Sequence, residues 1–469
     1  MNIGKAFSHL FASSGITKVI YFGATAYFAA RYGPEQIGSF YLFESFLIFS
    51  SLFSDFGING SIKKRISEVG KSSGPLSAGL LMKTTTLLLT LGASVILQDR
   101  VVDYIGHSKF RIVLFAVIAF NIKEVVKFVL QGEKKIGKSA NVELINRSAW
   151  GIFGFIFAIS GWRISAIFIS YVIGLSLSTI YGIIYTSTRL QLPNKSSFRS
   201  IIDYAKYNAI SSLSGFSFGW LDVAMLGILL GPAAVGLYET AWRVTGVLSL
   251  LSVSLANTLF PAISEKSSLG DLSKIGSLIS DALFASLYIA IPGSLGLILL
   301  SEEILLVVFG ADYTDAAILL SVLSLHKVLL AINSICGQGL HAIDLPNKAS
   351  LASVIGTIAN LGLNYGLILR FGAVGAAVAT VTAYTINTGL HYYYLRREIP
   401  IRFIRSQFWL LPFSTVIVVI VYLCSYLFSQ RSIVGLFITI IITAVVYFGI
   451  TLGTDRIRLR LKNLWANDL

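Results

Sequence analysis

The chain has 469 residues, of which 55% are hydrophobic and only 13% are charged, and its formal net charge is +14. A soluble protein carries roughly a quarter charged residues, so this composition excludes an ordinary soluble enzyme and indicates a membrane protein. The positive charge lies in short loops between apolar runs, where anionic lipid headgroups attract it, and we expect no nucleic acid partner. Cys336 and Cys424 both lie in apolar runs, which argues against a disulfide framework.

A membrane-spanning helix needs about 20 mostly apolar residues, and fourteen segments of the chain meet this condition. They are 11–31, 36–60, 76–97, 109–130, 141–160, 163–186, 205–230, 235–262, 279–300, 315–338, 348–370, 372–395, 408–429 and 432–453. Lysine and arginine gather in alternate loops, and the positive-inside rule then predicts an even number of helices with both termini in the cytoplasm. We expect a multi-pass protein of the cytoplasmic (inner) membrane.

A short Gly-Pro motif occurs twice at the same face of the predicted membrane domain, each time between an odd and an even helix. The copies are Gly33, Pro34 and Gly38, and then Gly231, Pro232 and Gly236. Plain turn chemistry explains one copy, whereas two copies separated by six helices indicate a duplication. An even number of helices per repeat keeps both halves in one orientation, so they are related by a pseudo-two-fold axis along the membrane normal.

The predicted fold is therefore an all-α polytopic membrane protein of about fourteen helices, with two six-helix halves and two extra C-terminal helices. The predicted parts are an N-terminal half (1–188), a cytoplasmic linker (189–204), a C-terminal half (205–397), helices thirteen and fourteen (398–455) and a tail (456–469). The tail places apolar residues on one helical face, which suits a helix lying on the cytoplasmic surface. A disordered, solvated tail is the alternative.

Charged side chains inside apolar runs are costly, and they usually face a cavity or one another. In the first half they are Lys18, Asp55, Lys123, Glu124, Lys127 and Arg147, and this set of four cations and two acids is net basic. Such a region predicts a pocket for an anionic headgroup, because phosphate oxygens accept strongly from lysine and arginine. Lys18 and Lys123 lie deeper and are candidate contacts, whereas Lys127 and Arg147 are expected to snorkel to the interface.

In the second half, Glu239 and Arg243 are one helical turn apart, and Asp222 lies at matching depth on the preceding helix. Two interpretations stay open. The three residues form an internally satisfied ion-pair cluster, or they form a carboxylate site for H⁺ or Na⁺ with Arg243 contacting substrate. Lys327, near mid-membrane and without a local acid, is a further candidate contact for an anion.

The sequence holds no catalytic constellation. It has no Walker A motif, so ATP is not the local energy source. The five histidines are scattered without metal-ligand spacing. We therefore expect a chain that is not an enzyme and that carries no cofactor or metal.

Three blocks of the sequence resemble the polysaccharide flippases of the Wzx type. They are ARYGPEQIGSFY with SDFGINGSIKKR in the first hairpin, the stretch from Tyr204 to Glu265 around DVAMLGILLGPAAVGLYETAWRV, and VVFGADYTDAAILLSVLS through GAVGAAVAT in helices nine to twelve. The resemblance covers nearly the whole chain. It implies a fourteen-helix member of the multidrug/oligosaccharidyl-lipid/polysaccharide exporter superfamily, which moves polyprenyl-pyrophosphate-linked oligosaccharide from the inner to the outer leaflet by alternating access.

The resemblance also implies roles for individual residues. It implies a cationic cavity in which Lys18, Arg243 and Lys327 contact the substrate, and it implies H⁺ or Na⁺ coupling or gating by Asp55, Asp222 and Glu239. The implied partners are a polyprenyl-linked glycan and membrane lipid, with a polysaccharide polymerase and glycosyltransferases as candidate protein partners.

Three rival functions are weaker. An ion-driven exporter of drugs or small solutes would use the same scaffold, but its site would be smaller and more aromatic. A membrane-bound polysaccharide polymerase or acyltransferase needs a large outer loop or a deep His/Arg constellation, and neither is present in the sequence. The loops are also too short for a scaffold that assembles glycan enzymes. The flippase is therefore the predicted function.

Overall fold

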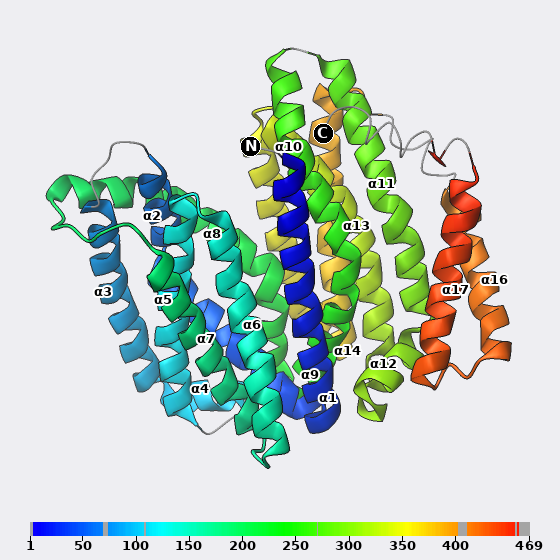
Figure 1. Cartoon of the computed structure of the whole chain (residues 1–469), viewed down its shortest axis with the longest axis horizontal. Helices are drawn as coiled ribbons and strands as arrows, with labels where there is room; N and C mark the ends of the chain where they lie inside the picture. The colour runs from blue at the N-terminus through cyan, green and yellow to red at the C-terminus, as the bar shows by residue number, and fades with distance from the viewer. Residues whose placement is uncertain are drawn as a thin grey trace. The chain divides into compact units, whose positions relative to one another are not determined.

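The computed structural model describes the backbone of residues 3–68, 74–106, 109–269, 271–401, 410–454 and 457–458. Within these residues the chain is built from helices and contains no β-strand (Figure 1). It divides into an N-terminal unit, Ser8–Gly236, and a C-terminal unit, Leu237–Leu469 together with Met1–Phe7. The predicted surface tail, apart from 457–458, lies outside the described residues.

The helices of the N-terminal unit are α1 (Ile3–Asp55), α2 (Ile58–Ser67), α3 (Gly74–Ile96), α4 (Gln98–Ile105), α5 (Phe110–Gly132), α6 (Ile136–Ile159), α7 (Ser165–Tyr185) and α8 (Lys195–Leu229). Helix α9 (Pro232–Thr245) leads into the C-terminal unit. There follow α10 (Ser249–Ser268), α11 (Leu272–Leu299), α12 (Ser301–Phe309), α13 (Ala317–Ala342), α14 (Pro346–Glu398), α16 (Leu410–Leu427) and α17 (Ile433–Leu452).

The described helices supply the predicted spans once their breaks are taken into account. Helix α1 breaks at Gly33 (φ 78°) and α14 breaks at Gly372 (φ 59°), so each is a pair of spanning helices. With α9 and α10 joined by a short 3₁₀ turn as one span, the described chain has the fourteen spans predicted from the sequence. The predicted all-α membrane fold is confirmed. The span predicted over 36–60 extends too far, because the helix ends at Asp55 and α2 begins at Ile58.

The two Gly-Pro motifs pack against each other inside the N-terminal unit. Gly231, like Gly33, has a positive φ (87°), which glycine adopts without steric cost. Pro232 opens α9, where its missing N–H is not needed. A Cβ on Gly38 would overlap the carbonyl oxygen of Pro232, and a Cβ on Gly236 would overlap the carbonyl oxygen of Pro34. Glycine at the last position of each motif therefore lets the two backbones touch, which the sequence comparison alone did not reveal.

Helix α8 begins earlier than predicted. Asn194 caps it by accepting a hydrogen bond from the backbone N–H of Ser197 (2.9 Å), so the helix starts at Lys195 inside the predicted linker. Helix α8 packs against α2, α3 and α4 and lies in the N-terminal unit. The domain boundaries predicted from the sequence follow the repeat instead, and they stay predictions.

Glu133, in the turn between α5 and α6, anchors the chain that follows α7. Its carboxylate accepts hydrogen bonds from the backbone N–H groups of Ser187 (2.8 Å) and Thr188 (2.6 Å), and it pairs with Lys135 (2.7 Å). Burial by itself would raise the pKa of Glu133, but the hydrogen bonds from Lys135 and Thr188 outweigh it and lower the pKa below 4.5. The ionised carboxylate therefore orders the start of the α7–α8 connection.

Replacing Gly38 tests the contact between the two motifs. Gly38→Ala should lower the free energy of unfolding by about 1–3 kcal/mol, because the new methyl group must displace backbone. Gly23→Ala in the same helix, where nothing lies within 4 Å of the added Cβ, should be neutral or stabilising. Unfolding of both variants in mixed micelles gives the comparison, and equal stabilities would disprove the close contact.

Glu133→Gln tests the anchor through its pH dependence. The folded pKa of Glu133 is lowered, so its contribution is present above pH 4.5 and is lost as the pH falls through the folded pKa. At pH 7 the variant should be less stable by about 1 kcal/mol, after allowance for solvent screening. The difference should shrink below about pH 4.5. Melting temperatures from pH 7 to pH 3 measure this. Glu35→Gln, at an exposed carboxylate, is the control, and a pH-independent difference at Glu133 would contradict the anchor.

Candidate functional site

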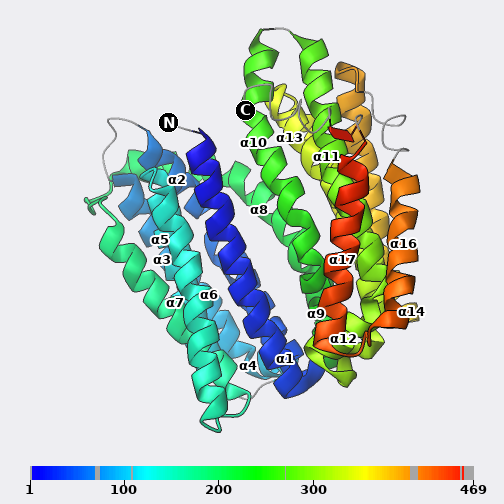
Figure 2. The same cartoon turned by 45° about the vertical axis from the view of Figure 1, so that its right-hand side comes forward.

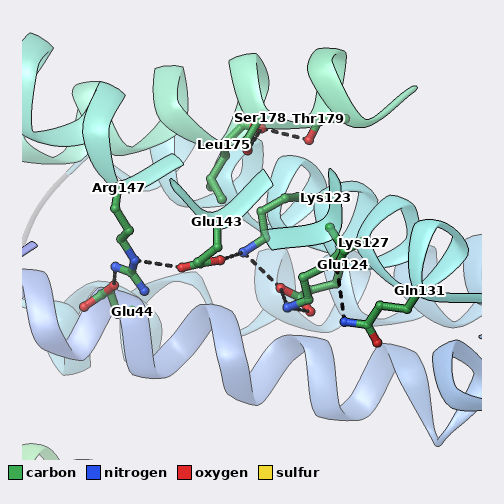
Figure 3. Close-up of polar contacts among 11 residues, drawn as sticks. Glu44, Lys123, Glu124, Lys127, Gln131, Glu143, Arg147, Leu175, Ser178 and Thr179 are labelled. Atoms are coloured by element: carbon green, nitrogen blue, oxygen red, sulfur yellow. Dashed lines mark hydrogen bonds and ion pairs between the residues drawn. The ribbon is translucent and has the colours of Figure 1, made fainter. Parts of the chain in front are cut away.

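Six charged side chains form a continuous chain of ion pairs inside the N-terminal unit, which we call the charge ladder (Figure 3). Its members are Glu44 on α1, Glu143 and Arg147 on α6, and Lys123, Glu124 and Lys127 on α5. The ladder links α1 to the consecutive helices α5 and α6, which come much later in the sequence. Its three cations and three carboxylates balance, so it carries no net charge.

Arg147 pairs with both Glu44 and Glu143. One terminal nitrogen lies 2.7 Å from Glu44 Oε1, and its Nε lies 2.8 Å from Glu143 Oε1. The guanidinium also lies 4.2 Å from the centre of the Tyr21 ring, and the Tyr21 hydroxyl donates to the other oxygen of Glu44 (2.8 Å). Glu44 is only 2% exposed. Both of its oxygens are therefore engaged, as a buried carboxylate requires.

Lys123 continues the ladder toward the end of α5. Its Nζ lies 2.9 Å from Glu124 Oε1 and 3.3 Å from Glu143 Oε2, and Lys127 Nζ lies 2.5 Å from Glu124 Oε2. Lys123 is 2% exposed. Lys123, which the sequence predicted to contact a headgroup, therefore lies between two carboxylates.

The ladder corrects two expectations. Arg147 and Lys127 do not simply snorkel to the interface, since both are paired with carboxylates. The basic excess of the region is also smaller than expected, because Glu44 and Glu143 were missed. One positive charge remains when the cations Lys18, Lys83, Lys123, Lys127 and Arg147 are set against the acids Glu44, Asp55, Glu124 and Glu143. The spacing of Glu143 and Arg147, one helical turn apart, was a signal for their pair, but no local pattern points to Glu44.

Asp55 serves two neighbours at the junction of α1 and α2. Its Oδ1 accepts from the backbone N–H of Asn59 in the first turn of α2 (3.0 Å) and from Lys83 Nζ of α3 (3.1 Å). Lys83 is 3% exposed and was also missed from the sequence. Asp55 therefore ties three helices together, and its predicted coupling role stays a prediction.

The C-terminal unit contains a second group, which we call the aromatic–cation cluster. It consists of Glu239, Trp242 and Arg243 on α9, His326 and Lys327 on α13, and Tyr384 on α14. Arg243 pairs with Glu239 at 3.1 Å, which is the helical-turn spacing expected from the sequence. With Lys327 included, these three charged residues have a net charge of one positive unit.

Trp242 is the centre of the cluster. Lys327 Nζ lies 3.5 Å from the centre of its ring, and the His326 ring stacks on it at 4.9 Å, with Tyr384 edge-on to His326 at 4.1 Å. Lys327 and His326 are 3% and 1% exposed. A desolvated cation over a tryptophan face gains about 2 kcal/mol, so the contact with the ring offsets part of the cost of burying this side chain.

Two further predicted residues, Lys18 and Asp222, belong to the N-terminal unit. Lys18 is exposed on α1 and makes no ion pair or hydrogen bond within the described residues. Asp222 is buried on α8 in the N-terminal unit, and its predicted place beside Glu239 stays a prediction. Among the residues that the structure describes, no group of three or more His, Cys, Asp or Glu side chains could hold a metal ion.

Disrupting the ladder tests its stabilising role. Arg147→Gln leaves the carboxylate of Glu44 buried without its charge partner, which should lower the free energy of unfolding by about 3–5 kcal/mol. Adding Glu44→Gln should restore part of the loss, because neighbouring changes do not add. Arg199→Gln, at an exposed pair 3.9 Å from Asp203, should change stability by less than about 1 kcal/mol. Strict additivity of the first two changes would show that the pair is not coupled.

Comparison with known proteins places the chain in a family. The family model described as lipid II flippase MurJ matches residues 87–448. The chain is 34% identical to the "Probable low-salt glycan biosynthesis flippase Agl15" of Haloferax volcanii, over 98% of this chain and 97% of the relative.

Two solved structures share the fold. The lipid II flippase MurJ in an inward closed conformation matches with a TM-score of 0.81 at 18% identity, over 95% of this chain and 99% of that one. An inward-facing multidrug resistance MATE family transporter of the MOP superfamily matches with a TM-score of 0.64 at 14% identity, over 82% of this chain and 94% of that one. The predicted superfamily is confirmed, and the chain belongs to the MurJ family of flippases.

Proposed function

We propose that this protein is a flippase that moves polyprenyl-pyrophosphate-linked oligosaccharide units from the inner to the outer leaflet by alternating access. The observation that carries the proposal is the full-length relationship to a glycan-biosynthesis flippase, which spans 98% of this chain. Family membership supports it independently. The protein is a transporter and not an enzyme.

The aromatic–cation cluster is the best candidate for holding the pyrophosphate. Lys327 lies over the Trp242 ring, and Arg243, the residue after Trp242, pairs with Glu239. The cluster therefore brings two cations and one carboxylate together on α9 and α13. Such a site attracts a diphosphate, because the diphosphate oxygens accept charge-assisted hydrogen bonds from lysine and arginine. Exposed Lys18 is a second candidate contact. Lys123 is weaker, since two carboxylates already hold its amino group.

Energy coupling by H⁺ or Na⁺ is part of the proposal. Asp55, Asp222 and Glu239 are the candidate carboxylates. Asp55 and Glu239 each have a cation partner, at 3.1 Å in both cases. Neutralising either carboxylate by a proton would release its partner, and this supports a gating role.

The proposed setting is the cytoplasmic membrane, with both termini in the cytoplasm. The alternation of basic loops supports this orientation. A polyprenyl-linked glycan and membrane lipid are then the direct partners, and a polysaccharide polymerase and glycosyltransferases would act on either side of the transport step.

An ion-coupled exporter of drugs or small solutes is the second candidate. The MATE family transporter with the same fold favours it, and so does the aromatic character of the cluster around Trp242. A drug site would need stacking surfaces more than positive charge, so changes in charge separate the two candidates.

Glycan export in a strain without its own polysaccharide flippase tests the proposal. The wild-type gene should restore surface glycan. Lys327→Met, which removes the charge while keeping most of the volume, should reduce export at least about tenfold, since one lost charged contact costs roughly 1.5–3 kcal/mol. Lys18→Ala and Arg243→Ala should reduce export less. Surface glycan is measured at matched protein levels.

Lys274→Ala is the matched control, because this exposed lysine pairs only with Asp271 at a helix start. If the wild type restores no glycan but confers efflux of drugs or dyes, the exporter is the better conclusion. If the Lys327, Lys18 and Arg243 variants all export as well as the wild type, the flippase stands and the proposed contacts are wrong.

A further inference from the structure

A groove with apolar walls lies between α3, α5 and α7 of the N-terminal unit. Figure 2 shows the backbone of these three helices. The groove has a volume of about 440 Å³, and its walls include Leu80, Val126, Val129 and Ile183. We call it the apolar groove. These walls suit a hydrocarbon chain and offer little to a sugar or a peptide backbone.

The few polar groups on the floor of the apolar groove are already satisfied. Lys83 donates to Asp55 (3.1 Å). Asn121 donates to the carbonyl oxygen of Val117 (2.9 Å) and accepts from Ser54 (2.6 Å). An occupant therefore needs no polar atoms at this depth.

A polar pocket of about 560 Å³ continues the groove at the helix ends, because Leu76 and Thr188 line both hollows. We call it the basic pocket. Its charged lining consists of Arg65, Lys135 and Arg189 against one carboxylate, Glu133. It lies where α5 ends and α6 begins, which is the level of lipid headgroups for a membrane helix.

The ion pairs in the basic pocket compensate only part of its positive charge. Arg65 pairs with Glu68 (3.1 Å), and Lys135 pairs with Glu133 (2.7 Å). Arg189 is exposed and makes no ion pair within the described residues. One cation of the lining is thus left over, directly beside the mouth of the apolar groove.

We propose that the apolar groove and the basic pocket together bind one anionic membrane phospholipid. One of its two hydrocarbon chains lies in the groove between α3 and α5, and its phosphodiester lies in the basic pocket against Arg189. The order of the two hollows, apolar within the membrane and basic at its surface, matches the two ends of such a lipid. The lipid links α2 and α3 to the chain that follows α7, so it stabilises the N-terminal unit. This site is separate from the proposed glycan contacts.

Lipid binding to the purified full-length protein tests the proposal directly. Detergent-solubilised protein is titrated with dioleoyl phosphatidylglycerol or dioleoyl phosphatidylcholine, and binding is followed by native mass spectrometry and by melting temperature. Phosphatidylglycerol should bind more tightly and raise the melting temperature more. Arg189→Gln should weaken its binding about fivefold, which corresponds to about 1 kcal/mol for one cation at the headgroup.

A second variant blocks the groove without touching the charge. Thr84→Trp places a large ring in the apolar groove and should remove the bound lipid. Leu88→Trp, one turn further along the same helix and 63% exposed, should leave binding unchanged. Arg100→Gln, an exposed cation on α4, should also leave it unchanged and is the control for Arg189→Gln.

Each other outcome overturns the proposal. Equal binding of phosphatidylglycerol and phosphatidylcholine would show that the basic pocket does not recognise an anionic headgroup. Unchanged binding in both Arg189→Gln and Thr84→Trp would place the lipid elsewhere. The same stabilisation by water-soluble glycerol 1-phosphate would indicate a site for free phosphate esters. None of these measurements involves transport, so they are independent of the glycan export experiment.

Discussion

An ionised side chain inside a membrane is tolerated only when another group compensates its charge, and the pair between Arg147 and Glu44 shows how the N-terminal unit meets this constraint. Glu44 is almost completely buried. The pair joins α6 to α1, and Lys123 extends the same network to α5. Helix α1 and the much later helices α5 and α6 are therefore held at one relative position by charge as well as by packing. Removing one member leaves the others buried and uncompensated.

The C-terminal unit handles its buried charge in another way. Lys327 lies over the face of Trp242, and Arg243 on the same helix as Trp242 pairs with Glu239. The aromatic face of Trp242 attracts the cation of Lys327, and Lys327 and Arg243 are proposed substrate contacts together with exposed Lys18 of the N-terminal unit. The ladder is balanced, and this supports a structural role for it.

Most of the fold was predictable because the requirement for a membrane span is local. Some twenty apolar residues suffice to identify a helix, and the motif at Gly33 and Gly231 marked the duplication. The polar sites were less predictable, since a partner can come from any helix. Glu239 with Arg243 was found from its spacing, but Glu44 and Lys83 were missed because their partners are distant in sequence. The snorkelling expected of Arg147 failed for the same reason.

The sequence by itself determined the class of protein, the spans and the family, because hydropathy and turn motifs depend on neighbouring residues only. The tertiary structure alone decided which charges are neutralised and which surfaces are hollow. The carbonyl contacts of Gly38 and Gly236, the pair between Glu44 and Arg147 and the basic pocket beside the apolar groove all join segments far apart in the chain. Such contacts follow from the packing of helices in three dimensions, and no local pattern in the sequence encodes them.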